Sequence, residues 1–253
     1  MTHLQVKNLS VNFGGLKALD DVSFSVAKNE VFSIVGPNGA GKSTIFNVIS
    51  SFYKPSQGKI FFDAKDITET RPDEKAKLGI TRTFQNIELF EHSSVLQNLL
   101  IGRTIHNKHP VYRQFIFDKT VRNSEIAHRE AAEKVIDFLE LAHYRDDLIA
   151  NLPYGVRKKV ELARALCAEP SLLLLDEPAS GLNPEETEEV GHWIEDIRHD
   201  LGITVVMIEH DMSLVTEVSD RVLALSEGKV IAQGTAEEVQ NNADVVSAYL
   251  GSA

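Results

Sequence analysis

The first third of the chain alternates short apolar stretches with clusters of Gly, Asn, Asp and Lys. This alternation is typical of β-strands bounded by turns. It predicts strands over residues 3–13, 22–26, 31–35 and 59–63. Residues 43–50 contain neither Gly nor Pro, so we expect a helix directly after Gly41.

The pattern changes between residues 86 and 152. Two sets of apolar residues there have helical spacing. They are Val95, Leu96, Leu99 and Leu100, and then Ala131, Val135, Phe138 and Leu139. An irregular basic stretch over about 103–122 separates them. We therefore predict a mostly helical insertion over 86–152 in a core formed by residues 1–85 and 153–253.

The last part of the chain predicts alternating helices and buried strands. One amphipathic helix is indicated by Val156, Val160, Ala163 and Cys167, spaced by four, three and four residues. Strands are predicted over 172–175 and 203–209, a helix over 185–199, and a final hairpin from 222–225 and 230–233. Short connections between such elements favour a parallel sheet with both faces covered.

Composition and charge narrow the classes of function. The chain has 253 residues, 43% of them hydrophobic, and a formal net charge of −11. This acidic balance argues against broad binding to nucleic acid or anionic lipid. Residues 1–6 read as a strand and not as a secretion signal, and the single cysteine, Cys167, excludes an internal disulfide and fits a reducing compartment. No apolar run approaches the roughly 20 residues of a membrane span, so a membrane link would require a partner protein.

One segment matches the phosphate-binding pattern G-x-x-x-x-G-K-[ST] in full. It comprises Gly36, Pro37, Asn38, Gly39, Ala40, Gly41, Lys42 and Ser43, with Thr44 next in the helix. The glycines let the backbone curl so that N–H groups face phosphate oxygens, and the helix N-terminus faces the same anion. Lys42 would reach the β- and γ-phosphates, and the Ser43 hydroxyl would ligate Mg²⁺. A chance match in a turn is the alternative, but the strand before and the helix after favour nucleotide binding.

Two adjacent carboxylates follow the buried strand over 172–175. Asp176 would hold Mg²⁺ directly or through water, and Glu177 would polarise the water that attacks the γ-phosphate. A solvated Asp-Glu pair is the alternative, and the phosphate loop upstream favours the functional interpretation. His210 ends the next strand and could hydrogen-bond the γ-phosphate. Since a lone histidine is more often structural, this role depends on the motifs around it.

The order of these motifs resembles the ATPase subunits of ABC transporters over essentially the whole chain. That resemblance implies a P-loop α/β cassette with an antiparallel β subdomain and a helical subdomain, which binds ATP with Mg²⁺ and hydrolyses it. It implies that Phe13 stacks on adenine and that Gln85 contacts metal or water and senses the membrane partner. Residues 180–183 are similar to the D-loop, His210 to the switch histidine, and 152–156 to the signature motif.

Two departures from the family pattern concern the shared ATP site. The usual Leu-Ser-Gly-Gly-Gln signature reads Leu-Pro-Tyr-Gly-Val here, so Pro153 replaces the phosphate-binding serine. Gly155 still offers a backbone N–H at a helix start for a phosphate across a dimer interface. The D-loop aspartate is replaced by Asn183. Symmetric hydrolysis at two sites is therefore in question.

The altered signature resembles that of the first ATPase of branched-chain amino-acid importers. Further segments that resemble this subfamily are residues 181–187, 208–212 and 246–251 and the long insertion after Gln85. This implies a subunit at the cytoplasmic face of the inner membrane. Its partners would be a second, related ATPase, two membrane permeases and, indirectly, a periplasmic binding protein. Nucleic acid is not expected to be a partner. A homodimer stays open as an alternative to the heterodimer.

Three other functions remain as alternatives. An exporter or lipid-transport ATPase shares the same motifs, although its signature more often retains Ser-Gly-Gly. A non-transport ABC ATPase acting on DNA or the ribosome usually carries coiled coils or two cassettes, and this chain shows neither. A nucleotide-binding regulator without turnover would need neither Glu177 nor His210.

Overall fold

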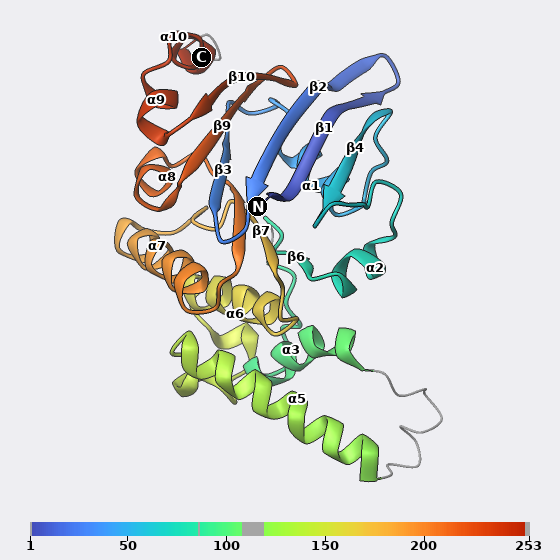
Figure 1. The fold of residues 1–253 in the computed structure, drawn as a ribbon. Helices are drawn as coiled ribbons and strands as arrows, with labels where there is room; N and C mark the ends of the chain where they lie inside the picture. Colours follow the sequence, from blue (N-terminus) through green and yellow to red (C-terminus); the bar gives the residue numbers. More distant parts are fainter. Residues whose placement is uncertain (1, 86, 108–118, 251–253) are drawn as a thin grey trace. The chain divides into compact units, whose positions relative to one another are not determined.

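The protein is described by a computed structural model that covers residues 2–85, 87–107 and 119–250. Contacts divide the chain into two units, one of residues 1–85 and 171–253 and one of residues 86–170. Figure 1 shows both, coloured along the sequence. Among the described residues, no helix is long and apolar enough to cross a membrane.

The first unit contains a four-stranded antiparallel sheet in the order β2-β1-β4-β5. Its strands are β1 (Thr2–Phe13), β2 (Leu16–Ala27), β4 (Gln57–Phe62) and β5 (Lys65–Asp66). Strand β2 begins six residues before the predicted start at 22, because its first residues pair with the end of β1, for example Leu16 with Phe13. Such ladder hydrogen bonds form between backbone groups and need no alternation of apolar side chains.

A six-stranded sheet in the order β10-β9-β3-β8-β7-β6 completes the strands of this unit. Its members are β3 (Val31–Val35), β6 (Ile80–Arg82), β7 (Leu172–Asp176), β8 (Thr204–Ile208), β9 (Arg221–Ser226) and β10 (Lys229–Gly234). All pairs are parallel except the edge pair of β9 and β10. Every residue of β3, β7 and β8 is buried, as expected for parallel strands covered on both faces. The carboxyl ends of these strands meet at one edge of the sheet, where ligands of α/β proteins bind.

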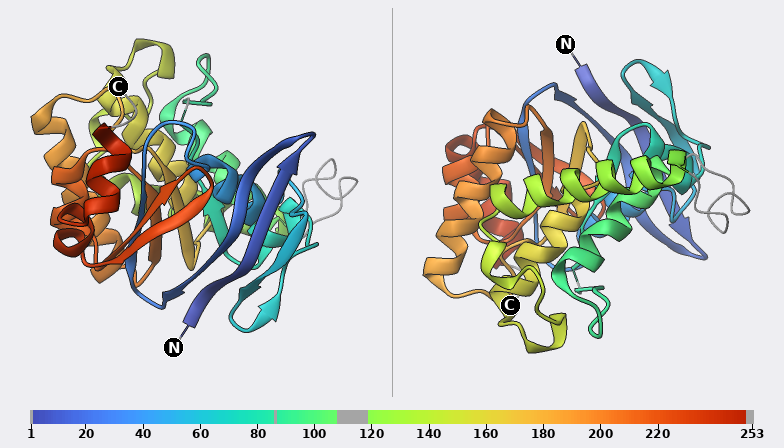
Figure 2. Two further views of the ribbon diagram at one scale, coloured as in Figure 1. Left: turned by 90° about the horizontal axis from the view of Figure 1, so that it is seen from above. Right: turned by 90° about the horizontal axis from the view of Figure 1, so that it is seen from below.

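The described residues of this unit also form six helices. They are α1 (Lys42–Ile49), α2 (Pro72–Lys77), α7 (Pro184–His199), α8 (Met212–Val218), α9 (Ala236–Gln240) and α10 (Ala243–Leu250). Helix α1 contributes Ile45, Phe46 and Ile49 to a core that also contains residues of both sheets, such as Leu4 and Ile34. Helices α7, α8 and α9 lie on the opposite face of the six-stranded sheet (Figures 1 and 2). The phosphate-loop helix is thus fixed between the two sheets.

A buried lysine closes the carboxyl end of α1. Lys75 of α2 is 1% exposed, and its Nζ donates to the carbonyls of Ile49 at 2.8 Å and Val48 at 3.3 Å. The last carbonyls of a helix lack intrahelical partners, and a cation there interacts favourably with the helix dipole. Burial lowers the pKa of Lys75 from 10.5 to about 8.

This depressed pKa predicts that stability depends on pH. Between about 8 and 10.5 the folded protein has released the Lys75 proton while the unfolded chain still binds it, so stability rises with pH. We expect the unfolding free energy, relative to that of Lys75→Met, to rise on the order of 1 kcal/mol per pH unit across this window. Urea unfolding of the unmodified protein and of Lys75→Met between about pH 7 and pH 10 measures this difference in unfolding free energy. Lys77→Met, at an exposed position of the same helix, is the control, and a difference independent of pH would contradict the assignment.

The second unit, residues 86–170, is helical in its described parts. It contains α3 (Val95–Gly102), α5 (Lys119–Phe138) and α6 (Tyr154–Leu166), with short 3₁₀ turns η1 (Arg103–His106), η2 (Ala142–Tyr144) and η3 (Ile149–Asn151). We expected the helical part to end at residue 152, but α6 also belongs to this unit. Helix α6 packs closely on α3, since a Cβ on Gly102 would lie 2.2 Å from the Arg164 carbonyl oxygen.

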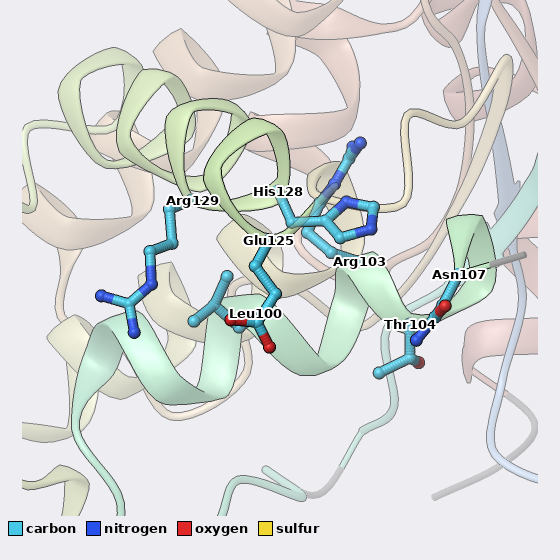
Figure 3. Close-up of a pocket in the computed structure, with 7 residues that line it drawn as sticks. All are labelled: Leu100, Arg103, Thr104, Asn107, Glu125, His128 and Arg129. Carbon is cyan, nitrogen blue, oxygen red and sulfur yellow. The ribbon is translucent and has the colours of Figure 1, made fainter. Parts of the chain in front are cut away.

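A cavity of about 180 Å³ lies within this helical unit (Figure 3). Arg103, Glu125, His128 and Arg129 are among its lining residues. The Arg103 guanidinium donates to the Cys167 carbonyl and pairs with Glu169. Burial lowers the pKa of His128, and burial raises that of Cys167 to about 12, so this thiol is unreactive at neutral pH.

Candidate functional site

A cavity of about 810 Å³ lies in the first unit, where the carboxyl end of β3 enters α1. Three groups of residues line it. The first is the loop and helix start over 38–44, the second is the end of β1 and start of β2, and the third brings in Gln85, Glu177, Glu227 and Gly228. Residues far apart in the sequence therefore enclose one site of a size suited to a nucleotide.

Two glycines make the loop before α1 geometrically feasible. Gly36 has φ of 149°, and a Cβ there would lie 2.2 Å from the Leu225 carbonyl oxygen. Gly41, the N-cap of α1, has φ of 100°, and a Cβ there would lie 2.7 Å from the Ala18 carbonyl oxygen. A residue with a side chain would be strained and obstructed at both positions. The N-terminus of α1, with its free N–H groups and positive dipole end, consequently opens onto the cavity.

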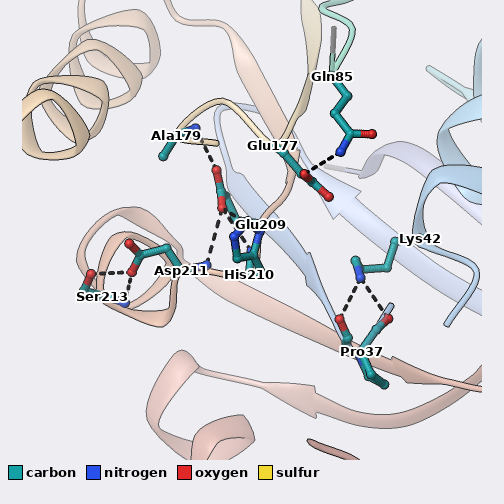
Figure 4. Close-up of polar contacts among 10 residues, drawn as sticks. Pro37, Lys42, Gln85, Glu177, Ala179, Glu209, His210, Asp211 and Ser213 are labelled. Carbon is teal, nitrogen blue, oxygen red and sulfur yellow. Dashed lines mark hydrogen bonds and ion pairs between the residues drawn. The ribbon is translucent and has the colours of Figure 1, made fainter. Parts of the chain in front are cut away.

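The ammonium group of Lys42 lies over the loop. Its Nζ donates to the carbonyls of Gly36 at 2.6 Å and Pro37 at 3.0 Å (Figure 4). Burial lowers the Lys42 pKa, while the charges of Glu177 and Asp176 oppose that shift. A buried cation at a helix N-terminus is an anion-binding arrangement.

The two carboxylates at the carboxyl end of β7 have different surroundings. Asp176 is 4% exposed, and its Oδ2 accepts a hydrogen bond from Arg82 Nη2 at 2.6 Å. Glu177 is half-buried and lines the cavity, where its Oε2 accepts from Gln85 Nε2 at 2.8 Å. The backbone of Glu177 is left-handed, with φ of 51°, and its N–H donates to the Ile208 carbonyl. A positive φ is uncommon in a residue that is not glycine, and Glu177 shares it with nine other such residues among those that the structure describes.

A buried glutamate joins the segments that follow β7 and β8 (Figure 4). Glu209 is fully buried, and its carboxylate accepts from the backbone N–H groups of Ala179 at 2.8 Å, His210 at 3.0 Å and Asp211 at 3.4 Å. Burial raises the Glu209 pKa, and these three donors oppose the shift. Glu209 therefore fixes the backbone two residues after Glu177 to the backbone of His210.

Two aromatic rings contact each other, and one of them lines the cavity. Phe13, at the end of β1, is 44% exposed and lines the cavity. Tyr53 contacts it edge to face, with ring centroids 5.0 Å apart and an interplanar angle of 75°. A half-exposed ring held in place by a second ring provides a surface for stacking a base.

Comparison with known proteins identifies the family. The model of the ABC transporter family matches residues 19–180, and a model described as branched-chain amino acid ATP-binding cassette transporter matches residues 229–253. The high-affinity branched-chain amino acid transport ATP-binding protein LivG of Salmonella typhimurium is 37% identical over 250 residues, which cover 99% of this chain and 98% of LivG. The chain belongs to the family of ABC transporter ATP-binding proteins.

Further relatives and solved structures agree with this assignment. The protein BraF of Pseudomonas aeruginosa, described in the same words as LivG, is 38% identical over 253 residues, covering 99% of this chain and 98% of BraF. The ADP conformation of an ATP-binding cassette of an ABC transporter superposes with a TM-score of 0.87 at 36% identity and covers 99% of each chain. A nucleotide-free cassette superposes with a TM-score of 0.86. The predicted family, fold class and ATPase activity are thereby confirmed.

The structure of this ABC ATPase brings many predicted site residues together. Phe13, residues 38–44, Gln85 and Glu177 line one cavity, and Gly36 and Pro37 hold the Lys42 ammonium group. Asp176 lies directly before Glu177 at the end of β7. His210 follows β8 next to Glu209, and most of its side chain is exposed. Gly155 is the second residue of α6 in the helical unit, and its role across a dimer interface stays a prediction.

Several residues of the ABC ATPase site were not predicted. Lys17 lines the cavity from the start of β2. Glu227 and Gly228 line it because the β9–β10 turn lies against the phosphate loop: the Gly228 N–H donates to the Ala40 carbonyl at 3.0 Å. The turn itself is visible in the sequence as Glu-Gly between two apolar stretches, but its position beside the loop is not. Arg82 and Glu209 were also overlooked, and only the position of each at a strand end could have indicated them.

Proposed function

We propose that this ABC ATPase hydrolyses ATP to energise a membrane importer of branched-chain or other amino acids. The observation that carries the proposal is the cavity in which the phosphate loop, Gln85 and Glu177 meet. The cargo class is supported by relatives named as branched-chain amino acid transport proteins, which align over nearly their whole length, and by the match of residues 229–253.

Nucleotide binding follows from the lining of the cavity. The adenine would stack on Phe13, whose ring is exposed and supported by Tyr53. The triphosphate would lie against the N–H groups of residues 38–44 and the N-terminus of α1. Lys42 would then exchange the carbonyls of Gly36 and Pro37 for phosphate oxygens, a charge-assisted contact.

The residues present fit a magnesium ion. The Ser43 hydroxyl, the Asp176 carboxylate and the Gln85 amide oxygen are the hard oxygen donors that Mg²⁺ prefers. No group of three His, Cys, Asp or Glu side chains among the described residues could form an all-protein metal site. That donor set agrees with a metal held jointly by a few side chains and the substrate phosphates. When bound, the ion neutralises charge between the β- and γ-phosphates.

Glu177 would act on the attacking water. Its carboxylate lies at the edge of the cavity, with one oxygen bonded to Gln85. It would accept a proton from the water as the γ-phosphoryl group is transferred, while Lys42 stabilises charge on the phosphate oxygens. His210 would contact the γ-phosphate from the end of β8, held there through the bond of its backbone N–H to Glu209.

The proposed partners are the other subunits of the importer. A second ATPase subunit would present its signature segment to the nucleotide bound by this chain. In return, Gly155 of this chain would contact the nucleotide bound by the second subunit. Two permeases would hold the pair at the cytoplasmic face of the inner membrane, and a periplasmic binding protein would deliver cargo. Hydrolysis would bias the subunit pair between a closed and an open state.

Capture of partners tests this proposal. Protein tagged at one terminus and expressed in its native cell is expected to co-purify from detergent-solubilised membranes with two permeases and a second ATPase. Mass spectrometry identifies them, and cells expressing the tag alone provide the background. Recovery of two copies of this chain with permeases would favour the homodimer. Recovery of ribosomal or nucleic-acid-binding proteins without permeases would overturn the transport function.

A further inference from the structure

Arg82, at the end of β6, is a buried cation in contact with the proposed metal ligand. Its side chain is 8% exposed, and Nη2 donates to Asp176 Oδ2 at 2.6 Å. Nη1 donates to Asn47 Oδ1 of α1 at 2.8 Å. One guanidinium therefore joins the strand that precedes Gln85, the helix after the phosphate loop and the carboxylate at the end of β7.

Three aromatic rings fix the position of this guanidinium. Its carbon lies 5.2 Å from the centroid of Phe84, 5.4 Å from that of Phe46 and 6.0 Å from that of Phe52. The buried Nε has no hydrogen-bond partner among the described residues. Burying a guanidinium with one unsatisfied donor costs free energy. Its hydrogen bonds to Asp176 and Asn47 offset part of this cost, and they hold the group in one orientation.

The segment that contains Arg82 runs alongside both carboxylates at the end of β7, Asp176 and Glu177. The Thr83 N–H donates to the Leu174 carbonyl at 2.9 Å, and Gln85 Nε2 donates to Glu177 Oε2 at 2.8 Å. Arg82 and Gln85 thus contact two adjacent carboxylates, Asp176 and Glu177, from a stretch of four residues. A shift of this stretch would move the partners of both carboxylates together.

We propose that Arg82 is a positioning residue for the metal site. It holds Asp176 through one carboxylate oxygen and leaves the other oxygen for the ion. By the same contact it ties the ligand to the segment that ends in Gln85. The inference rests on the magnesium site of the proposed function and adds to it a residue that itself touches neither metal nor nucleotide.

The energetic consequence follows from the burial of the pair. Without Arg82, Asp176 would be a carboxylate at a buried strand end that has lost its ion-pair partner. Lysine would keep the charge but, as a point charge on a flexible stem, could not hold Asn47 and Asp176 at once in the fixed fork of arginine. Loss of an outer-shell partner of a metal ligand typically weakens metal affinity about 10- to 100-fold.

The test compares the affinity for the non-hydrolysable ATP analogue AMPPNP with Mg²⁺ and with EDTA, measured by isothermal titration calorimetry. The ratio of the two affinities is the contribution of the metal. We expect Arg82→Met to reduce this ratio about tenfold or more, with Arg82→Lys intermediate, while the affinity in EDTA stays within about twofold. Asn47→Ala, which removes only the second anchor, should reduce the ratio by a smaller factor.

Arg221→Lys is the matched control for lost stability. Arg221 makes an equally close pair with buried Glu30, at 2.6 Å, but at the end of the sheet opposite the phosphate loop. We expect Arg221→Lys to lower the melting temperature without changing the ratio of the AMPPNP affinities with Mg²⁺ and with EDTA. An unchanged ratio in the foldable Arg82 variants and in Asn47→Ala would overturn the inference. No effect of Mg²⁺ on the unmodified protein would instead overturn the proposed metal site, and the inference with it.

Discussion

Replacement of Glu177 by glutamine is expected to abolish ATP turnover while ATP binding is retained. Glutamine keeps the size of the side chain and can still bond to Gln85, but it cannot accept a proton from water. General-base catalysis contributes about 10²- to 10⁴-fold, so the kcat should fall by at least two orders of magnitude. Phosphate release measures turnover, and equilibrium titration with a fluorescent ATP analogue measures binding.

A trapped state provides a second readout for Glu177→Gln. Because bound ATP would bridge two subunits and is no longer cleaved, size-exclusion chromatography of the variant with its partner ATPase and ATP should show a closed dimer. Glu195→Gln is the control, since Glu195 is an exposed carboxylate of α7 and is not among the residues that line the cavity. It should leave turnover nearly unchanged. Hydrolysis by Glu177→Gln at the rate of the unmodified protein would contradict the catalytic assignment.

The fold could be predicted where its signals are local. The buried strands β3, β7 and β8 are short apolar runs, and α7 has helical periodicity, so both were predicted within about one residue at most ends. The early start of β2 and the short strand β6 were not predicted. Both depend on pairing with a distant strand, which a local pattern does not contain. For the same reason the allocation of α6 to the helical unit could not be derived from its amphipathic face.

The candidate site was predictable to the same degree. Residues 36–43 form a contiguous pattern, and Asp176 and Glu177 follow an unmistakable buried strand. Arg82 and Glu209 acquire their roles only through contacts with residues far along the chain, at Asp176 and Ala179. The left-handed backbone of Glu177 is equally invisible, because glutamate shows no preference for that conformation.

Removal of the Glu209 carboxylate is expected to reduce both stability and turnover. In Glu209→Ala the N–H groups of Ala179, His210 and Asp211 lose their acceptor in a buried environment, and each such loss costs about 1–3 kcal/mol. The segment after Glu177 would also be free to leave its strained position. Since misplacement by about 1 Å can lower a rate about 10²-fold, we expect the kcat to fall by one to two orders of magnitude.

Glu30→Ala separates the two consequences. Glu30 is also buried and accepts bonds from a backbone N–H and from Arg221, but it precedes β3 at the end of the sheet away from the phosphate loop. Glu30→Ala should lower the melting temperature, as Glu209→Ala does, but the kcat per folded molecule should be retained. Glu209→Gln, which keeps one acceptor oxygen, should lie between the unmodified protein and Glu209→Ala. Equal losses of kcat in Glu30→Ala and Glu209→Ala, each measured well below its melting temperature, would show that Glu209 contributes only to folding. A loss confined to the Glu209 variants would mean that the two strand-end segments must be joined for Glu177 and His210 to act on the same phosphate.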